Sequence, residues 1–310
     1  MNELVRHLED YLRLRRALGH QMAEAAWLLP DFVAFLDGRG QSTVTVQATL
    51  AWVRLREGEV VTTVSPRRVT AVRGFARYLS GIDPDTEVPP MGLVPYRLRW
   101  RPPFLYSDAD ITALIAATET IEQPFRAATY RTLVGLLAAS GLRVGEAIGL
   151  NGDDIDWARG VLLIRESKFG KSRLVPLHDS VVRALREYDG LRAEIAPRRP
   201  KQPAFFLSRT RKRLIYAVVC PTFRHLVNAA GVGADAPRPP RLHDLRHTFA
   251  VRTLLGWYRT GANVQAKMPS LSTYLGHREP AHTYTYLSAA PELLALAAAR
   301  REGIGKAARS

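Results

Sequence analysis

Residues 241–247 read Arg-Leu-His-Asp-Leu-Arg-His, residues 275–277 read Leu-Gly-His, and residues 284–286 read Tyr-Thr-Tyr. This part of the chain gathers histidine, arginine and tyrosine side chains within 46 residues. Cleavage of a phosphodiester requires an in-line nucleophile, positive charge beside the nonbridging oxygens and a proton for the departing oxygen. These side chains can supply all three, so the pattern predicts cleavage of a DNA strand by a tyrosine.

A second arginine-bearing stretch, residues 140–146, reads Ser-Gly-Leu-Arg-Val-Gly-Glu, and its arginine lies 100 residues before His243. The glycine predicts the end of one helix, and Arg143 stands at the start of the next. Arg143 and Arg246 can form two guanidinium forks on the nonbridging oxygens, each with charge-assisted hydrogen bonds. A solvated surface arginine is the less favoured alternative, because Arg143 follows a turn into an apolar helix and Arg246 stands between histidines.

The spacing of His243 and Arg246 places the two residues on one face of a helix. His243 can then accept the tyrosine proton or hydrogen-bond the phosphate. His247 is expected to be a supporting or core histidine. The two histidines also have the ligand spacing of zinc proteases, but those proteins need glutamate where this chain has Asp244, so we expect no metal site.

Tyr286 is the preferred nucleophile and Tyr284 is its rival. Residues two apart on a helix point in different directions, so only one of them can face the arginines. A turn at Gly276 and Pro280 leads from His277 to both tyrosines. An unperturbed phenol has a pKa of about 10, so neighbouring arginine and histidine groups must activate it. The alternative for each tyrosine is a packed aromatic side chain.

Residues 161–167 and 173–177 are short β-prone runs on either side of Lys-Phe-Gly-Lys-Ser, residues 168–172. This pattern predicts a β-hairpin with glycine in its turn. Lys168 at the tip can reach into the DNA groove as general acid for the departing 5′ oxygen. Lys171 competes for the same role, and chemistry alone does not separate the two lysines. The alternative for both is a solvated turn residue.

The charge of the chain predicts a polyanionic partner. The formal net charge is +15, with 44 basic and 29 acidic residues. Residues 1–100 carry a net charge of +2 and residues 101–310 carry +13, so the later part is expected to face the phosphates. Its most basic run, residues 183–213, holds ten basic and three acidic side chains. Such a run is most often a solvated face, but here it can follow the DNA backbone.

The single cysteine, Cys220, leaves neither an intramolecular disulfide nor a cysteine-rich zinc site, which fits a reducing cytosol. The N-terminus lacks the basic-then-apolar pattern of a signal peptide. No apolar run reaches the roughly 18 residues that span a bilayer. We therefore expect a cytoplasmic protein with no membrane partner.

The chain is expected to form two domains. Residues 1–80 predict a bundle of four helices with tight loops, and residues 81–103, which contain six prolines, are interpreted as a linker. Residues 104–310 make the second domain. Helices are expected there at about 107–117, 125–139, 143 onward, 180–193, 221–230, 243–256, 270–275 and 291–301. The predicted fold class is mainly α with a small antiparallel β-sheet (α+β).

Together these residues resemble the tyrosine recombinase (phage integrase) family over most of residues 105–290. The resemblance implies a catalytic set of arginine, lysine, His-x-x-Arg, histidine or tryptophan, and tyrosine, which falls on Arg143, Lys168, His243, Arg246, His277 and Tyr286. It selects Lys168, five residues before the arginine of Arg-Leu-Val-Pro, and Tyr286, nine residues after the histidine of Leu-Gly-His. The N-terminal bundle is similar in outline to the family's core-binding (SAM-like) DNA-binding domain.

The resemblance implies a site-specific DNA recombinase or integrase that needs no metal and no nucleotide cofactor. Tyr286 would attack the scissile phosphate to give a 3′-phosphotyrosyl enzyme and a free 5′ hydroxyl, and a hydroxyl from a partner duplex would reverse the step. The implied partner is double-stranded DNA, and the implied assembly is a homo-tetramer on two DNA sites. Residues 291–301 are a candidate for exchange between protomers. Phage integration, transposition, cassette exchange and dimer resolution all remain open as the process.

Two alternatives remain. A type IB topoisomerase would use a similar site as a monomer and reseal the same strand. A non-catalytic DNA-binding protein of the same fold would have lost part of the catalytic set, and no member is missing here. The chain departs from the family pattern around residues 257–270, where the segment is longer than usual, and we expect it to lengthen a loop near the site.

Overall fold

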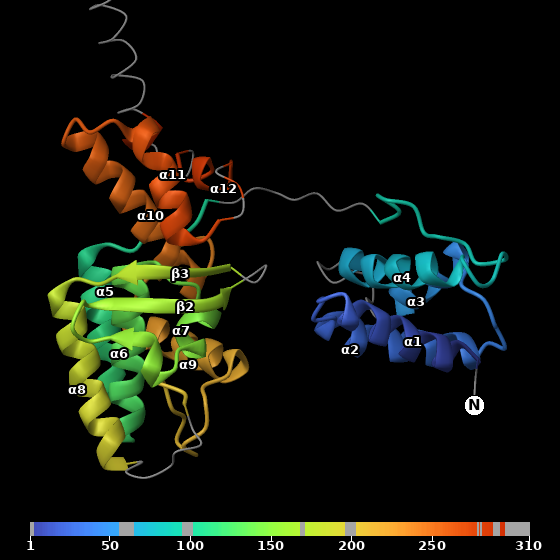
Figure 1. The fold of residues 1–310 in the computed structure, drawn as a ribbon, viewed down its shortest axis with the longest axis horizontal. Helices are drawn as coiled ribbons and strands as arrows, with labels where there is room; N and C mark the ends of the chain where they lie inside the picture. The colour runs from blue at the N-terminus through green and yellow to red at the C-terminus, as the bar shows by residue number, and fades with distance from the viewer. Residues whose placement is uncertain are drawn as a thin grey trace, which may run out of the picture. The chain divides into compact units, whose positions relative to one another are not determined.

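The structure, a computed structural model, describes residues 3–55, 65–94, 102–167, 171–195, 203–277, 279, 281–287 and 292–294. The chain divides into two compact units, Met1–Trp100 and Arg101–Ser310. Each unit has its own buried apolar core. Both are built mainly from helices, and the second adds a small sheet (Figure 1).

The first unit contains the helices α1 (Glu3–Ala17), α2 (Ala23–Asp37), α3 (Val46–Leu55) and α4 (Ser65–Leu79). Their apolar faces meet around Trp52, which is 2% exposed and whose ring centroid lies 5.0 Å from that of Phe32. The indole Nε1 donates a hydrogen bond of 2.9 Å to Asp31, which satisfies the polar atom of the buried ring. These are the four helices that the sequence predicts for residues 1–80.

Residues 81–94, the first part of the expected linker, pack against this bundle. Arg73 of α4 donates hydrogen bonds of 2.7 Å to the carbonyl oxygens of both Pro89 and Pro90. Three apolar side chains of the segment, Val88, Leu93 and Val94, are partly buried against the bundle core. The stretch that follows, 95–101, lies outside the described residues.

The second unit contains the helices α5 (Asp108–Ala116), α6 (Pro124–Ser140), α7 (Val144–Gly149), α8 (Asp179–Ile195), α9 (Tyr216–Ala229), α10 (Leu242–Arg259), α11 (Val264–Leu275) and α12 (Ala281–Tyr284). Its antiparallel sheet has the strand order β1 (Ile155–Asp156), β2 (Val161–Ser167) and β3 (Lys171–Pro176). Figure 1 shows α10, α11 and α12 together at one end of the unit, beside β3. The predicted fold class, mainly α with a small antiparallel sheet, is confirmed.

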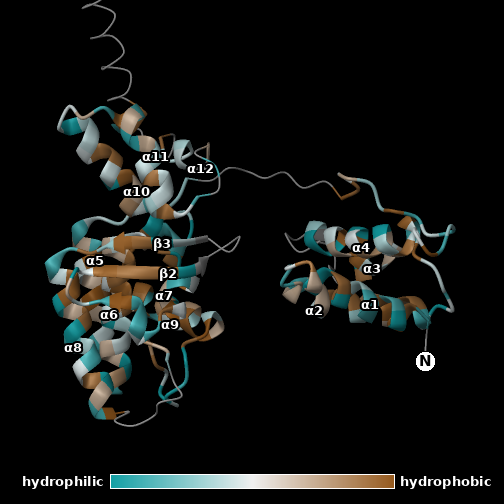
Figure 2. Cartoon of the chain, in the orientation of Figure 1, coloured by the Kyte–Doolittle hydropathy of each residue, from teal (hydrophilic) through white to brown (hydrophobic). Residues whose placement is uncertain are grey.

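The inner face of the sheet follows the two-residue alternation of β-strands. Leu162 and Ile164 of β2 are 0% and 2% exposed, and Figure 2 shows β2 as hydrophobic along most of its length. Leu162 pairs with Val175 of β3, and Ile164 pairs with Arg173. Directly paired residues point to the same face of a sheet, so Arg173 occupies an inward-facing position among apolar neighbours.

The segment around residues 257–270, which was expected to lengthen a loop, is largely helical. Helices α10 and α11 leave only residues 260–263 as their connection. The Asn263 side chain caps α11 by accepting a hydrogen bond of 3.1 Å from the Ala266 N–H. Trp257 packs against the apolar cluster that α10 and α11 share. The loop prediction is therefore wrong, because these residues satisfy their backbone groups within helices and bury apolar surface.

Only the start of the helix expected at 291–301 is described. Residues 292–294 are helical, and Leu293 is 0% exposed in the cluster of α10 and α11. Glu292 forms an ion pair of 2.6 Å with Arg259. The rest of this expected helix lies outside the described residues.

Replacement Phe206→Ala should destabilise the second unit by about 3–5 kcal/mol, because truncation of a buried aromatic ring leaves a cavity. The Phe206 ring is fully buried, with centroid distances of 5.1 Å to Phe205 and 5.3 Å to Tyr188. Denaturant unfolding measures the change. The control is Leu174→Ala, whose side chain is 65% exposed and whose loss should cost less than about 0.5 kcal/mol. Equal unfolding midpoints for the two variants would contradict the assignment of this core.

Candidate active site

Arg143 stands where α6 gives way to α7. Gly141 ends α6 with a φ of 61°, a left-handed conformation that favours glycine, and Arg143 is the N-cap residue of α7. The Arg143 guanidinium donates to the Glu146 carboxylate at 2.8 Å and to the Gly276 carbonyl at 3.0 Å. The side chain keeps 27% of its surface exposed, so it is only partly covered by its protein partners.

Arg246, on α10, is almost fully buried at 2% exposure. Its guanidinium donates to the carbonyls of Gly141 at 2.9 Å and Leu275 at 2.5 Å. Burial is the main cause that lowers the pKa of Arg246 to about 10; Tyr286 and Glu146 act against this shift, and the charge of Arg143 adds to it. The group stays charged at neutral pH. A buried cation whose direct acceptors are neutral carbonyls gains strongly from a nearby anion.

Three consecutive carbonyls at the end of α11 accept hydrogen bonds from three arginines. The acceptor and donor residues are Tyr274 with Arg173 (2.7 Å), Leu275 with Arg246 (2.5 Å), and Gly276 with Arg143 (3.0 Å). The last carbonyls of a helix lack partners within the helix and carry the negative end of its dipole. The turn that precedes His277 is therefore fixed to β3, α10 and the start of α7.

Tyr286 lies between two imidazole rings. Its ring is stacked on that of His277, with centroids 5.8 Å apart, and meets the His247 ring edge-on at 5.4 Å. His247 in turn meets the His243 ring edge-on at 4.7 Å. Tyr286 is 4% exposed, and it is near enough to the buried Arg246 to influence the pKa of that guanidinium. The preferred nucleophile thus lies close to the buried arginine.

The remaining candidates are less completely described. Tyr284, the rival nucleophile, is 47% exposed on α12. Lys168 lies outside the described residues, and of Lys171 only the backbone, at the first position of β3, is described. The structure therefore brings together the predicted site residues that it describes, and the place of Lys168 stays a prediction.

The environment of His243 favours its neutral form. Desolvation by the surrounding protein is the largest cause, followed by the positive charge of His247 and Arg246, while Asp244 acts against them; the net result lowers the pKa of His243 to about 4. By its surface area His243 is an exposed residue, although protein atoms crowd around its ring, and repulsion by the neighbouring cations also favours a neutral ring at pH 7. A neutral imidazole can accept a proton or a hydrogen bond.

Three supporting residues received no role from the sequence. Thr283, 0% exposed, shares a hydrogen bond of 2.7 Å with Nδ1 of His277, and when the hydroxyl donates, Nε2 of that ring carries the proton. Glu146 and Arg173 form a buried ion pair of 2.9 Å. The supporting role of two of them could have been predicted from the sequence. Glu146 stands one helical turn after Arg143, and Arg173 is a charged residue at an inward-facing position of a strand. Thr283 had no comparable signal.

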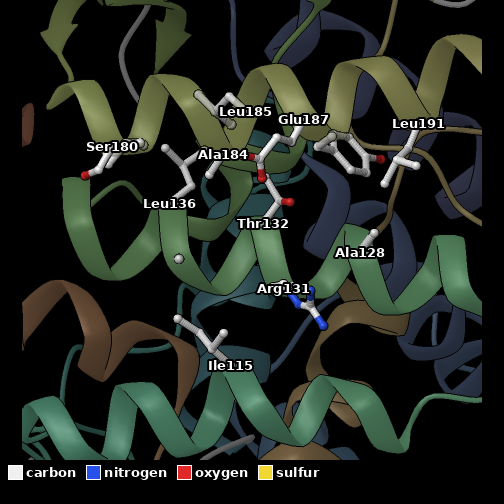
Figure 3. Close-up of a pocket in the computed structure, with 13 residues that line it drawn as sticks. Ile115, Ala128, Arg131, Thr132, Leu136, Ser180, Ala184, Leu185, Glu187 and Leu191 are labelled. Atoms are coloured by element: carbon white, nitrogen blue, oxygen red, sulfur yellow. The ribbon is translucent and has the colours of Figure 1, made fainter.

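A separate apolar groove of about 370 Å³ opens between α5, α6 and α8 (Figure 3). Ile115, Leu136, Leu185 and Leu191 contribute to its lining. None of the five candidate catalytic residues that the structure describes lines it, so the groove is distinct from the arginine cluster.

In the described ranges, no group of three or more His, Cys, Asp or Glu side chains is arranged to hold a metal ion. None of the helices described is both long and apolar enough to cross a membrane.

Sequence comparison places the chain in a family. The profile of the phage integrase family matches residues 105–292. The chain is 40% identical to y4rB of Sinorhizobium fredii, named as a candidate integrase/recombinase, over 95% of the chain and 96% of that protein. It is 30% identical to tyrosine recombinase XerD of Pseudomonas aeruginosa, with 91% of each chain covered. The chain therefore belongs to the phage integrase family.

Solved structures share the fold. A crystal structure of XerA recombinase matches with a TM-score of 0.52 and 22% identity, over 96% of this chain and 99% of that one. The Tn1549 transposon integrase in complex with transposon right-end DNA matches with a TM-score of 0.64 and 16% identity, over 96% and 99%. From the family and its relatives, this protein is a tyrosine-type site-specific recombinase or integrase that acts on DNA.

The free protein should show a His243 imidazole that titrates near pH 4, below the ordinary histidine value of 6.5. Because the folded-state pKa is lowered, protonation favours the unfolded chain. The stability contribution of neutral His243 is therefore complete above pH 6.5 and is lost as the pH falls toward 4. NMR titration of the imidazole protons, assigned by comparison with His243→Gln, measures the midpoint. A midpoint at or above 6.5 would rule out the lowered pKa.

Proposed function

We propose that Tyr286 cleaves DNA by attacking the scissile phosphate. The phenolic oxygen forms a bond to phosphorus while the bond to the 5′ oxygen breaks, which leaves a 3′-phosphotyrosyl link and a free 5′ hydroxyl. Neutral His243 is the candidate acceptor of the phenolic proton, and Lys168 the candidate donor of a proton to the departing oxygen. A 5′ hydroxyl from a second duplex reverses the step and joins the exchanged strands.

Charge neutralisation is assigned to Arg143 and Arg246, with His277 as a hydrogen-bond donor to the phosphate. The observation that carries this proposal is that the Tyr286 ring stacks on His277, at a centroid distance of 5.8 Å, directly after the turn whose carbonyls hold Arg143 and Arg246. A phosphate that binds Arg246 would lie beside the nucleophile. Arg143 and Arg246 are fixed to adjacent carbonyls of the same turn, so both guanidiniums can act on one phosphate.

Replacement Tyr286→Phe should abolish the covalent protein–DNA adduct, because the variant lacks the nucleophilic oxygen. DNA affinity should change less than about threefold, since the phenyl ring still packs between the imidazoles. A nicked suicide substrate that traps the adduct, read on a denaturing gel, makes the measurement. Tyr284→Phe is the matched control and should form adduct at the wild-type rate. Adduct in the Tyr286→Phe protein would remove Tyr286 as nucleophile.

Cleavage should use arginine and tyrosine from the same chain, because Tyr286 stacks on His277 of its own chain and the turn before His277 holds Arg143 and Arg246. A mixture of Tyr286→Phe and Arg143→Gln proteins should therefore give no adduct above the level of either protein alone. Recovery of adduct in the mixture would show that the nucleophile acts on a phosphate held by another subunit.

Lys168→Met should slow cleavage of an ordinary phosphodiester, with Lys171→Met as the matched control from the same predicted turn. A substrate with sulfur in place of the bridging 5′ oxygen should restore cleavage by Lys168→Met, because a thiolate leaves without protonation. Single-turnover adduct formation on both substrates makes the test. Rescue of Lys171→Met instead of Lys168→Met would reassign the general acid.

The proposed partner is double-stranded DNA, and the proposed assembly is a tetramer on two sites. A solved lambda integrase structure, which shares this fold with a TM-score of 0.61 at 17% identity, is a tetramer bound to a Holliday junction. We assign DNA binding also to the N-terminal bundle, where Arg15, Arg67, Arg73 and Arg77 line one depression of about 680 Å³. Relaxation of supercoiled plasmid without a paired target site would favour a monomeric topoisomerase.

A further inference from the structure

The Glu146 carboxylate joins two arginines from separate elements. Arg173 of β3 binds it with both terminal nitrogens, at 3.0 and 2.9 Å. Arg143 donates to it from the side chain at 2.8 Å and from the backbone N–H at 3.0 Å. Burial by itself raises the pKa of Glu146, but the hydrogen bond and charge of Arg173, followed by the hydrogen bonds of Arg143, outweigh burial and bring the pKa below its usual value. The carboxylate is therefore ionised at neutral pH.

Arg173 also reaches the end of α11. Its Nε donates a hydrogen bond of 2.7 Å to the Tyr274 carbonyl. The turn fits closely around this side chain, because a Cβ on Gly276 would come within 2.7 Å of Nη1 of Arg173. One guanidinium, 9% exposed, therefore contacts both the carboxylate that holds Arg143 and the turn that leads to His277.

We propose that Arg173 is a positioning residue for DNA cleavage, which acts through Glu146 and Tyr274 to hold Arg143 and the His277 turn in place for the scissile phosphate. This rests on the proposed function, in which Arg143 neutralises the phosphate. Without Arg173 the buried Glu146 carboxylate keeps only the donors of Arg143, and the Arg143 guanidinium can then extend its hydrogen bonding from one oxygen to both. Arg143 is then drawn toward Glu146 and away from the phosphate.

Replacement Arg173→Gln should reduce the single-turnover rate of adduct formation on a suicide substrate about 100-fold, the size expected for a misplaced catalytic group. DNA affinity, measured by gel shift, should change less than about threefold, because Arg173 bonds to protein atoms. The variant is therefore expected to lose cleavage rate while it keeps its DNA affinity.

A second substrate separates positioning of Arg143 from general damage. A methylphosphonate at the scissile position has no negative charge on the replaced oxygen, so cleavage depends far less on arginine. The defect of Arg173→Gln relative to wild type should shrink to about fivefold or less on this substrate. Arg143→Gln, measured beside it, should lose its own defect in the same way.

Two further variants test the shape of the Arg173 side chain and the effect of removing another arginine from the sheet. Arg173→Lys keeps the charge but loses the fork that spans two oxygens and a carbonyl, so it should cleave about tenfold slower than wild type. It also carries the test if Arg173→Gln does not fold. Arg165→Gln is the matched control, because Arg165 lies on the adjacent strand β2 and ion-pairs with the buried Asp154. It should cleave at the wild-type rate.

The outcomes test the positioning role of Arg173 separately from the phosphate-binding role of Arg143. Wild-type cleavage by both Arg173 variants, or a defect of equal size on the two substrates, overturns the positioning role while leaving the proposed chemistry intact. Normal cleavage by Arg143→Gln overturns the assigned role of Arg143, and the inference about Arg173 fails with it. A defect of Arg173 variants that disappears on the methylphosphonate supports the inference.

Discussion

The three arginine hydrogen bonds to the C-terminal turn of α11 are the constraint on which the candidate site depends. A helix end leaves carbonyls without partners, and arginine side chains with little solvent access need acceptors. Here the arginines supply the donors that the helix-end carbonyls lack, and the carbonyls supply the acceptors that the arginines need. The donors come from the start of α7, from β3 and from α10, so one short turn aligns elements that are far apart in the chain. The same turn sets the position of His277.

The site is electrostatically prepared for an anion. Arg246 is 2% exposed and donates hydrogen bonds to two neutral carbonyls, while Glu146 is shared by two other arginines. The imidazoles of His243 and His247 have lowered pKa values, first because of desolvation, and so add no charge at neutral pH. A phosphodiester would supply the negative charge that these guanidiniums stabilise, without reorganisation of the protein.

Local patterns predicted most of the elements that carry the site. Helical periodicity and glycine stops located α6 and the start of α7, and β-prone runs around a lysine- and glycine-containing turn located β2 and β3. The predicted starts of two helices were wrong, and each error has a local cause. Helix α9 begins at Tyr216, before the expected residue 221, because Pro221 stands inside the helix and does not start it. Helix α11 begins at Val264 because Asn263 caps it, so its first turns fall within the segment 257–270 that was expected to lengthen a loop.

The sequence by itself determined the chemistry available to this protein: two arginines, a lysine, two histidines and a tyrosine, which stand in short motifs whose spacing reflects local helix and hairpin geometry. Family membership follows from the same local order of residues. Only the tertiary structure decided which groups meet. The pairing of Arg173 with Glu146, 27 residues apart, and of Arg143 with Gly276, 133 residues apart, depends on how the sheet and helices pack. Such long-range contacts leave no periodic trace in the chain, because they are set by burial and by the need to satisfy polar groups in the folded state.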